Sequence, residues 1–448
     1  MRNRAACLLV LSVFAEPALA DPSTDGYWPG WRGASGQGVS EETRLPLAWS
    51  AETNVRWKAD IAGRGYSSPV VWGKRIFLTT DIEGDVVPGA RAVKHLDEGK
   101  EFDHPDGVGA DRKHTFKVVA LDGDSGKLLW ERVAWEGTPY DTRHKRGAYA
   151  APTPVTDGER VIASFGGEGL YAYDFAGKPL WKVELGGIAT MGVGYGISPL
   201  LYRGLVIVQC DEDNGEKSFL AAYDKKTGKP AWRVARKVQV SWATPILVKS
   251  SVGRDELITA GNEHVIAYDP ADGRELWRMK GLASNAVPSP VAGKDVVVLT
   301  SGYPTKVAVA VRPGGSGDVT DSASVLWKYA KGTAYVPSPI LYGDYVYLVT
   351  DRGLLSCLDA RTGEVKYEGA RPPSGTSFMA SPVAYDGKLL LVNMDGDAIV
   401  IKAGPSFEVL SSNAMGQPMA ASPAIAKGRL YIRGEKTLFC IEAARPQG

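Results

Sequence analysis

The chain has 448 residues, of which 44% are hydrophobic and 23% charged. This is the composition of a folded protein and excludes a disordered or collagen-like chain. Fifty-two Lys and Arg against 51 Asp and Glu leave a formal charge of +1, so no basic field for nucleic acid is expected. The 52 glycines favour a turn-rich, all-β protein.

Residues 1–20 have the features of a secretory signal peptide. Arg2 and Arg4 precede an apolar run over residues 5–14, and the small residues at 18–20 provide a cleavage site. We therefore expect a periplasmic or secreted protein after cleavage near Ala20. No later stretch is apolar enough for a transmembrane helix.

Residues 21–53 are expected to form an N-terminal lead-in, and residues 54–448 a domain of repeats. The domain starts with a strand at 54–58, which has no local partner and contains Trp57. The last repeat lacks its final strand after Ile441. The N-terminal strand should therefore complete the last repeat and close the domain.

Two sequence anchors define the repeat. The first is a Ser/Thr-Pro pair before an apolar strand, and consecutive prolines lie 41 to 49 residues apart except for one interval of 85. The eight pairs are Ser68-Pro69, Thr153-Pro154, Ser198-Pro199, Thr244-Pro245, Ser289-Pro290, Ser338-Pro339, Ser381-Pro382 and Ser422-Pro423. A period of this length is typical of propellers and other repeat architectures.

The second anchor is an Asp, a Gly and a Trp that close each repeat, as in residues 120–130 and 222–232. This pattern predicts a hairpin, because Asp initiates a turn and Gly adopts positive φ. The Trp is expected to pack between neighbouring repeats. Each repeat then supplies four antiparallel strands, and the sequence predicts an eight-bladed β-propeller closed by the N-terminal strand.

One rim of this propeller is expected to carry the function. In each blade, the loop entering the first strand (D-to-A) and the loop between the second and third strands (B-to-C) open on the same rim. The long interval places an insertion at about 81–115 in the B-to-C connection of blade 1. All five histidines map to this rim: His95, His104, His114, His144 and His264.

The D-to-A loops also carry aromatic and cationic residues just before the Ser/Thr-Pro pairs. The candidate ligand-binding residues at the channel mouth are Arg64, Tyr66, Arg143, His144, Arg146, Tyr149, Tyr195, Trp242, Asn285, Tyr335 and Phe378. They would bind a planar or sugar-like ligand by stacking and cation–π contact. The alternative is that the aromatic side chains only fill a wide channel.

Metal binding has weaker support. His104 and His114 are the only candidates, and their spacing fits no known zinc motif, so a solvated polar loop is the alternative and no metal site is expected. Cys210, Cys357 and Cys440 are far apart in sequence and are expected to be buried thiols.

The Asp-x-x-Thr/Ser-Gly-x-x-x-Trp repeats and the lead-in at 28–33 resemble the pyrroloquinoline-quinone (PQQ) type of propeller repeat. Similar exported chains are described as quinoprotein-like or as relatives of the outer-membrane assembly propeller. The resemblance implies the fold over residues 54–442 and makes PQQ and calcium conceivable cofactors. The chain departs from the quinoprotein alcohol dehydrogenases, since it has no adjacent cysteine pair and no haem motif.

The sequence supports two functions from different classes. The first is an exported, non-catalytic propeller that binds an envelope protein, a peptide or a glycan on the rim of D-to-A and B-to-C loops. The alternative is a quinone-dependent or metal-dependent oxidoreductase that uses the same channel mouth.

Overall fold

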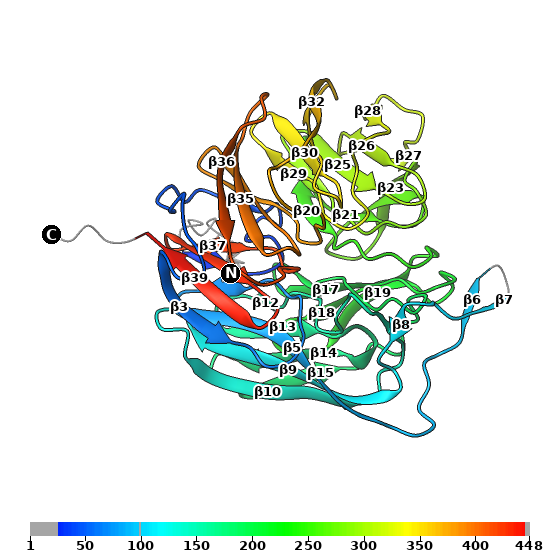
Figure 1. The fold of residues 1–448 in the computed structure, drawn as a ribbon. Coiled ribbons are helices and arrows are strands. Elements are labelled where there is room, and N and C mark those ends of the chain that lie inside the picture. Colours follow the sequence, from blue (N-terminus) through cyan, green and yellow to red (C-terminus); the bar gives the residue numbers. More distant parts are fainter. Residues whose placement is uncertain (1–25, 98–99, 444–448) are drawn as a thin grey trace, which may run out of the picture.

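Eight blades, each with four antiparallel strands, are arranged in a ring (Figure 1). The computed structural model describes residues 26–97 and 100–443. The eight-bladed propeller predicted from the repeats is confirmed. The predicted signal peptide, residues 1–20, lies outside the described residues.

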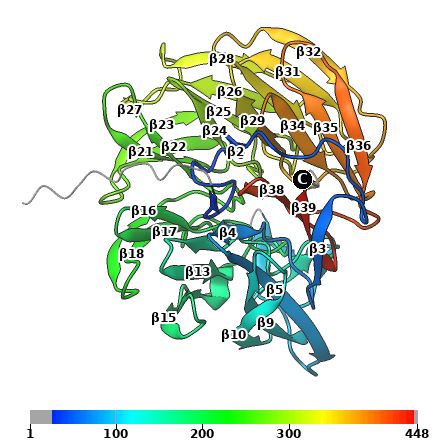
Figure 2. The same cartoon turned by 90° about the vertical axis from the view of Figure 1, so that its left-hand side faces the viewer.

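The first four blades follow one another along the chain (Figure 2). From the first strand outward they are β4 (Val70–Trp72), β5 (Arg75–Val86), β9 (Arg112–Asp122) and β10 (Leu128–Gly137); β12 (Val155–Thr156), β13 (Arg160–Ser164), β14 (Leu170–Asp174) and β15 (Pro179–Val183); β16 (Leu200–Tyr202), β17 (Leu205–Cys210), β18 (Phe219–Asp224) and β19 (Pro230–Ala235); β20 (Ile246–Lys249), β21 (Asp255–Ala260), β22 (His264–Tyr268) and β23 (Glu275–Lys280). A 3-10 turn, Gly166–Glu168, joins β13 to β14.

The remaining four blades complete the ring. They are β24 (Val291–Gly293), β25 (Val296–Ser301), β26 (Val307–Val311) and β28 (Val325–Tyr329); β29 (Ile340–Tyr342), β30 (Tyr345–Val349), β31 (Leu355–Asp359) and β32 (Val365–Ala370); β33 (Val383–Tyr385), β34 (Lys388–Val392), β35 (Asp397–Lys402) and β36 (Val409–Ala414); β37 (Ala424–Ala426), β38 (Arg429–Arg433), β39 (Thr437–Glu442) and β3 (Val55–Asp60). The short β27 (Gly317–Asp318) pairs with the outer strand of blade 4.

The N-terminal strand closes the ring as predicted. Strand β3 pairs antiparallel with β39, with Trp57 opposite Cys440. On the inner side, the first strands of blades 8 and 1, β37 and β4, contact each other. Residues 55–60 and residues 424–442 therefore form one blade.

The Ser/Thr residues that start the blades form a circular relay of hydrogen bonds. The backbone N–H of each donates to the hydroxyl of the next blade over 2.9 to 3.2 Å, from Ser68 through to Ser422. The step from Ser422 back to Ser68 is missing, and the Ser68 hydroxyl has no partner among the described residues. The recurring hydroxyl thus satisfies a buried backbone donor between neighbouring blades.

The recurring tryptophans lie between blades, as predicted. The indole of Trp57 packs on Gly126 of the next blade, where a Cβ would lie 2.5 Å from the ring, and its Nε1 donates to the Gly123 carbonyl. The equivalent pairs are Trp130 with Gly177, Trp181 with Gly228, Trp232 with Gly273 and Trp327 with Gly363. These glycines have φ between 70° and 80°, so the same residue makes the turn and the space for the indole.

The lead-in crosses the channel, which the sequence did not predict. Strand β1 (Tyr27–Trp28) joins the inner edge of blade 1, and β2 (Val39–Ser40) joins blade 7 in parallel. Between them Trp31 donates from Nε1 to the Ser289 hydroxyl of blade 5 over 3.2 Å. Figure 2 shows this dark-blue segment in the middle of the ring.

The blade-1 insertion is shorter than expected. Strands β5 and β9 continue the ladder beyond the predicted ends, with Ile82 opposite Thr115 and Glu83 opposite His114, so the ends of the 81–115 segment are paired strands. The connection between them contains β6 (His95–Asp97), β7 (Lys100–Phe102) and β8 (Gly107–Val108). Strand β8 pairs with β11 (Arg143–His144), which docks the insertion on the D-to-A loop of blade 2.

Candidate channel-mouth site

A cavity of about 770 Å³ opens at the channel mouth. Every loop that lines it is a D-to-A or a B-to-C loop, which are the loops expected to share one rim. The lining residues are His104, His144, Arg146, Gly147, Val193, Trp242, Val287, Tyr335, Val336, Asp351, Arg352, Thr376, Ser377, Phe378 and Met379.

An inner cavity of about 230 Å³ continues from the mouth into the channel. Its wall includes six hydroxyls of the circular relay, from Ser198 to Ser422, together with Tyr66, Tyr195 and Trp242. Trp31 of the lead-in lines this inner cavity but not the mouth cavity. Sequence reasoning missed Trp31 because it lies outside the repeats.

Hydrogen bonds fix two aromatic side chains of the inner cavity, Trp242 and Tyr195. Trp242 donates from Nε1 to the Gly194 carbonyl over 2.8 Å, and Tyr195 donates to the Gln209 carbonyl over 2.6 Å. Burial, reinforced by Cys210, raises the pKa of Tyr195, so its hydroxyl stays neutral. The polar ends of these rings are occupied by the protein, and both side chains line the inner cavity.

Eight of the eleven predicted residues line one of the connected cavities, and three do not. His144, Tyr335 and Phe378 line the mouth, whereas Arg64 lines a smaller side chamber together with Tyr66 and Arg146. Phe378 is also part of the core and is 1% exposed. Arg143, Tyr149 and Asn285 line none of these three cavities, although Tyr149 lines a small neighbouring cavity that shares Gly194 and Tyr195 with the inner cavity.

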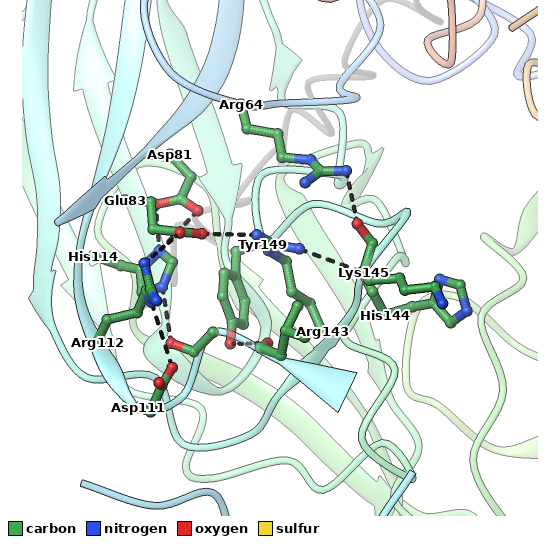
Figure 3. A network of polar contacts seen from close by, with 12 residues as sticks. Arg64, Asp81, Glu83, Asp111, Arg112, His114, Arg143, His144, Lys145 and Tyr149 are labelled. Carbon is green, nitrogen blue, oxygen red and sulfur yellow. Dashed lines mark hydrogen bonds and ion pairs between the residues drawn. The ribbon is translucent and has the colours of Figure 1, made fainter. Parts of the chain in front are cut away.

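Arg143 and Tyr149 belong to a buried network beneath the insertion (Figure 3). Arg143 forms an ion pair of 2.9 Å with Glu83, and the Tyr149 hydroxyl donates to the Asp141 carbonyl over 2.9 Å. The Tyr149 ring contacts His114 edge-on. Arg143 also pairs with Val108 of the insertion, and the Tyr149 hydroxyl lies 3.4 Å from the Val108 carbonyl, so both residues hold the insertion on the loop before blade 2. Asn285 instead forms an isolated bridge with Tyr303.

The two histidines considered for metal binding have separate environments. His114 is fully buried, with Nδ1 2.9 Å from both carboxylate oxygens of Asp81 and Nε2 2.9 Å from the Gly109 carbonyl (Figure 3). His104 lies beside His144, with 5.7 Å between ring centroids. In the described ranges, no group of three or more His, Cys, Asp or Glu residues is arranged to hold a metal ion.

The insertion is clamped to blades 2 and 3 through His95, which is 2% exposed. Its Nδ1 bonds to Asp213 at 2.7 Å, and its Nε2 forms an ion pair of 3.0 Å with Asp141. Burial alone would lower the pKa of His95, but the two carboxylates outweigh it and raise the pKa to about 10. The imidazolium thus ties the insertion to the loop before blade 2 and to the B-to-C loop of blade 3.

The residues of the mouth do not fit a calcium-assisted quinone. Calcium needs several oxygen ligands with carboxylates among them. Asp351 is the single carboxylate that lines the mouth or the inner cavity, and it accepts the backbone N–H groups of Tyr335 and Val336 over 2.7 and 2.9 Å. The three described cysteines are buried, unpaired and absent from these walls.

The fold and the repeat define a PQQ-like β-propeller. The family described as outer membrane protein assembly factor BamB matches residues 114–368, which is more than half of the chain. The chain therefore belongs to this family of PQQ-like propellers. It is 23% identical over 316 residues to the outer membrane protein assembly factor BamB of Burkholderia pseudomallei, covering 66% of this chain and 64% of that protein's length.

Solved structures share the fold. BamB from Moraxella catarrhalis superposes with a TM-score of 0.54 at 14% identity, covering 82% of this chain and 99% of that one. The quinohemoprotein alcohol dehydrogenase from Comamonas testosteroni gives a TM-score of 0.62 at 12% identity, covering 94% and 82%. Because BamB and an alcohol dehydrogenase superpose on this chain comparably, the fold does not decide the function.

No helix within the described ranges is both long enough and apolar enough to cross a membrane.

Proposed function

We propose that this chain is an exported, non-catalytic envelope propeller whose channel mouth binds a partner protein or peptide. The observation that carries the proposal is the mouth cavity, whose wall combines Val, Met and aromatic side chains with a few polar groups. Tyr335 and Tyr303 extend this surface on the rim, at 38% and 57% exposure and 5.6 Å between ring centroids. Exposed aromatic residues beside a concave apolar wall are typical of protein-binding sites.

The family supports an envelope protein as the partner. The description of the family and the name of the Burkholderia relative both refer to outer membrane protein assembly. The predicted signal peptide would deliver this chain to the same compartment. A glycan is the other ligand that the aromatic wall would accept, by stacking on Trp242 or Tyr335.

The groups at the mouth support binding rather than catalysis. Asp351 is engaged by two backbone N–H groups, and burial lowers the pKa of His144 in spite of Asp106 at 3.4 Å. Arg146 donates to the Ser377 hydroxyl over 2.8 Å and so bridges the loops before blades 2 and 7. Asp351, His144 and Arg146 thus each already contact another group of the protein.

Site-specific photo-crosslinking tests the proposal. A photoreactive amino acid is placed at Tyr335 on the mouth and, as the control, at Val252, which is 66% exposed in the turn between β20 and β21. That turn connects a first to a second strand and so belongs to the opposite rim. We expect a defined protein adduct in intact envelopes from position 335 only. The adduct should weaken when Trp242→Ala is introduced.

Three outcomes would contradict the proposal. Equal adducts from both positions would show non-specific contact. Specific binding of the purified protein to a glycan array, without a protein adduct in envelopes, would favour a sugar ligand. Saturable binding of PQQ with calcium, followed by absorbance and lost in Trp242→Ala, would favour the oxidoreductase instead.

A further inference from the structure

A side chamber of about 140 Å³ lies next to the channel mouth and is lined by residues of blades 7, 8 and 1 and of the loop before blade 2. Its polar lining residues are Arg64, Tyr66, Lys145, Arg146, Arg433 and Glu435. Tyr66 also lines the inner cavity and Arg146 also lines the mouth, so the chamber is continuous with both. Four cationic side chains therefore face one small space with a single carboxylate.

Three of these cations have only neutral partners. Arg64 donates from Nη2 to the Tyr66 hydroxyl at 3.1 Å and to the Lys145 carbonyl at 2.9 Å, as Figure 3 shows for the second contact. Arg146 donates to the Ser377 hydroxyl. Arg433 donates from Nη1 to the backbone carbonyl and the hydroxyl of Ser67, at 3.0 and 2.7 Å.

Carboxylates do not neutralise this charge within the described part of the chain. None of the three arginines forms an ion pair there, and Glu435 forms none either. Lys145 is the exception, because its Nζ lies 2.8 Å from Asp106. The chamber thus retains the charge of three guanidinium groups opposite one exposed carboxylate.

The buried charge of Arg433 is unfavourable to the stability of the protein unless a counter-ion lies beside it. It is 2% exposed, and burial lowers its pKa to about 9. An unpaired buried charge is strongly unfavourable, and a guanidinium presents paired N–H donors that match the oxygens of a carboxylate or phosphate. Both hydrogen bonds of Arg433 leave from Nη1, so Nε and Nη2 keep donors without a protein acceptor in the described residues.

The backbone is shaped to accommodate this guanidinium. Residue 65 is a glycine, and a Cβ placed there would lie 2.6 Å from Nη2 of Arg433 and 2.6 Å from the Thr79 carbonyl. Any other residue would push Arg433 out of its position. The absence of a side chain at Gly65 therefore keeps the charged group beside the chamber.

We propose that the side chamber is a binding site for one oxyanion, a carboxylate or a phosphate, held by Arg64, Arg146 and Arg433. The chamber volume is several times the ~30 Å³ that one water molecule occupies, which is enough for such a group. The proposal does not depend on partner binding at the mouth. The oxyanion can come from a free small anion or from an acidic group on a larger ligand.

Anion titrations of the full mature chain test the site. Isothermal titration calorimetry and thermal melts are run with inorganic phosphate, acetate and a short peptide ending in a free carboxylate, with chloride at equal ionic strength as the reference. The variants are Arg64→Gln and Arg146→Gln. The matched control is Arg361→Gln, an exposed arginine in the turn between β31 and β32 that lines neither the mouth, the inner cavity nor the chamber.

We expect saturable binding of at least one oxyanion, weakened about tenfold or more in each chamber variant and less than about twofold in Arg361→Gln. Preference for phosphate over the carboxylates, or the reverse, identifies the source. Arg433→Gln and Arg433→Met both remove the positive charge, and each should abolish the effect of the anion on the melting temperature. The proposal is overturned if no oxyanion binds better than chloride, or if Arg361→Gln weakens binding as much as Arg64→Gln.

Discussion

Replacing His95 with Gln is expected to release the insertion from blades 2 and 3 while the blades stay folded. The imidazolium is the only side chain of the described insertion that contacts both Asp141 and Asp213. Gln keeps a hydrogen-bond donor at this position but removes the positive charge. The carboxylates keep other donors, since Thr190 and Met191 bond to Asp141 and Asp213.

The size of the effect follows from the pKa of His95. Folding raises it from 6.5 to about 10, and each unit is worth about 1.4 kcal/mol. The charge therefore contributes at most about 5 kcal/mol to holding the insertion in place. A buried ion pair that loses one partner costs a similar amount, about 3–5 kcal/mol.

The pH dependence has a definite sign. Because the folded pKa of His95 is above the unfolded value, the stabilisation is complete below pH 6.5 and decreases as the pH rises towards about 10. The difference in stability between the wild type and His95→Gln should therefore shrink by roughly 1.4 kcal/mol per pH unit over that interval. Above the folded pKa the two proteins should behave alike.

Hydrogen exchange resolved to peptides measures the effect. Amides of residues 87–111 should exchange faster in His95→Gln at pH 6.5, and those of β14 and β18 should not change. His264→Gln is the control, because within the described residues the His264 imidazole bonds only to the carbonyl of Asn262 in its own turn. Equal protection of the insertion in His95→Gln and the wild type at pH 6.5 would refute the clamp.

Three further predictions concern the ring. Ser198→Ala should destabilise the protein by about 1–3 kcal/mol in urea unfolding, because it leaves the buried N–H of Thr153 without an acceptor, whereas Ser68→Ala should cost much less. Trp327→Ala should cost about 3–5 kcal/mol, since the indole is 8% exposed and bonds to the Ala360 carbonyl. Deleting residues 50–60 removes β3 and should lower the melting temperature more than Trp57→Ala does.

Each of these predictions has a contrary result. Equal destabilisation by Ser198→Ala and Ser68→Ala would mean that the relay contributes nothing. An unchanged midpoint for Trp327→Ala would place the indole in solvent. A truncated chain that melts like the full one would show that β3 does not close the ring.

The blades could be predicted because their signals are local and repeated. Each Asp-Gly turn is made within its own few residues, as when Asp224 accepts the N–H groups of Lys226 and Thr227. The repeated Trp alone then predicts a contact with the next blade, whatever the sequence of that blade. Ring closure could also be predicted, because the strand that contains Trp57 has no partner nearby in the sequence.

The site was less predictable because its contacts join distant residues that belong to no repeat. Arg143 and Tyr149 match the loop pattern of the mouth residues, but the insertion covers them, and nothing in the loop itself indicates that cover. Arg433 lies at the end of β38, the second strand of blade 8, where the sequence predicts no site residue. Its importance depends on Gly65 and Ser67, which lie more than 360 positions away in the sequence.

The joint between blades 8 and 1 explains why the chamber lies where it does. At the other seven joints a backbone N–H donates to the hydroxyl of the next blade, but here the Ser68 hydroxyl has no such donor. The joint instead has Arg433 of blade 8 donating to Ser67 of blade 1. A guanidinium thus stands where the repeat provides a neutral contact, and the closure of the ring brings a buried positive charge beside the channel mouth.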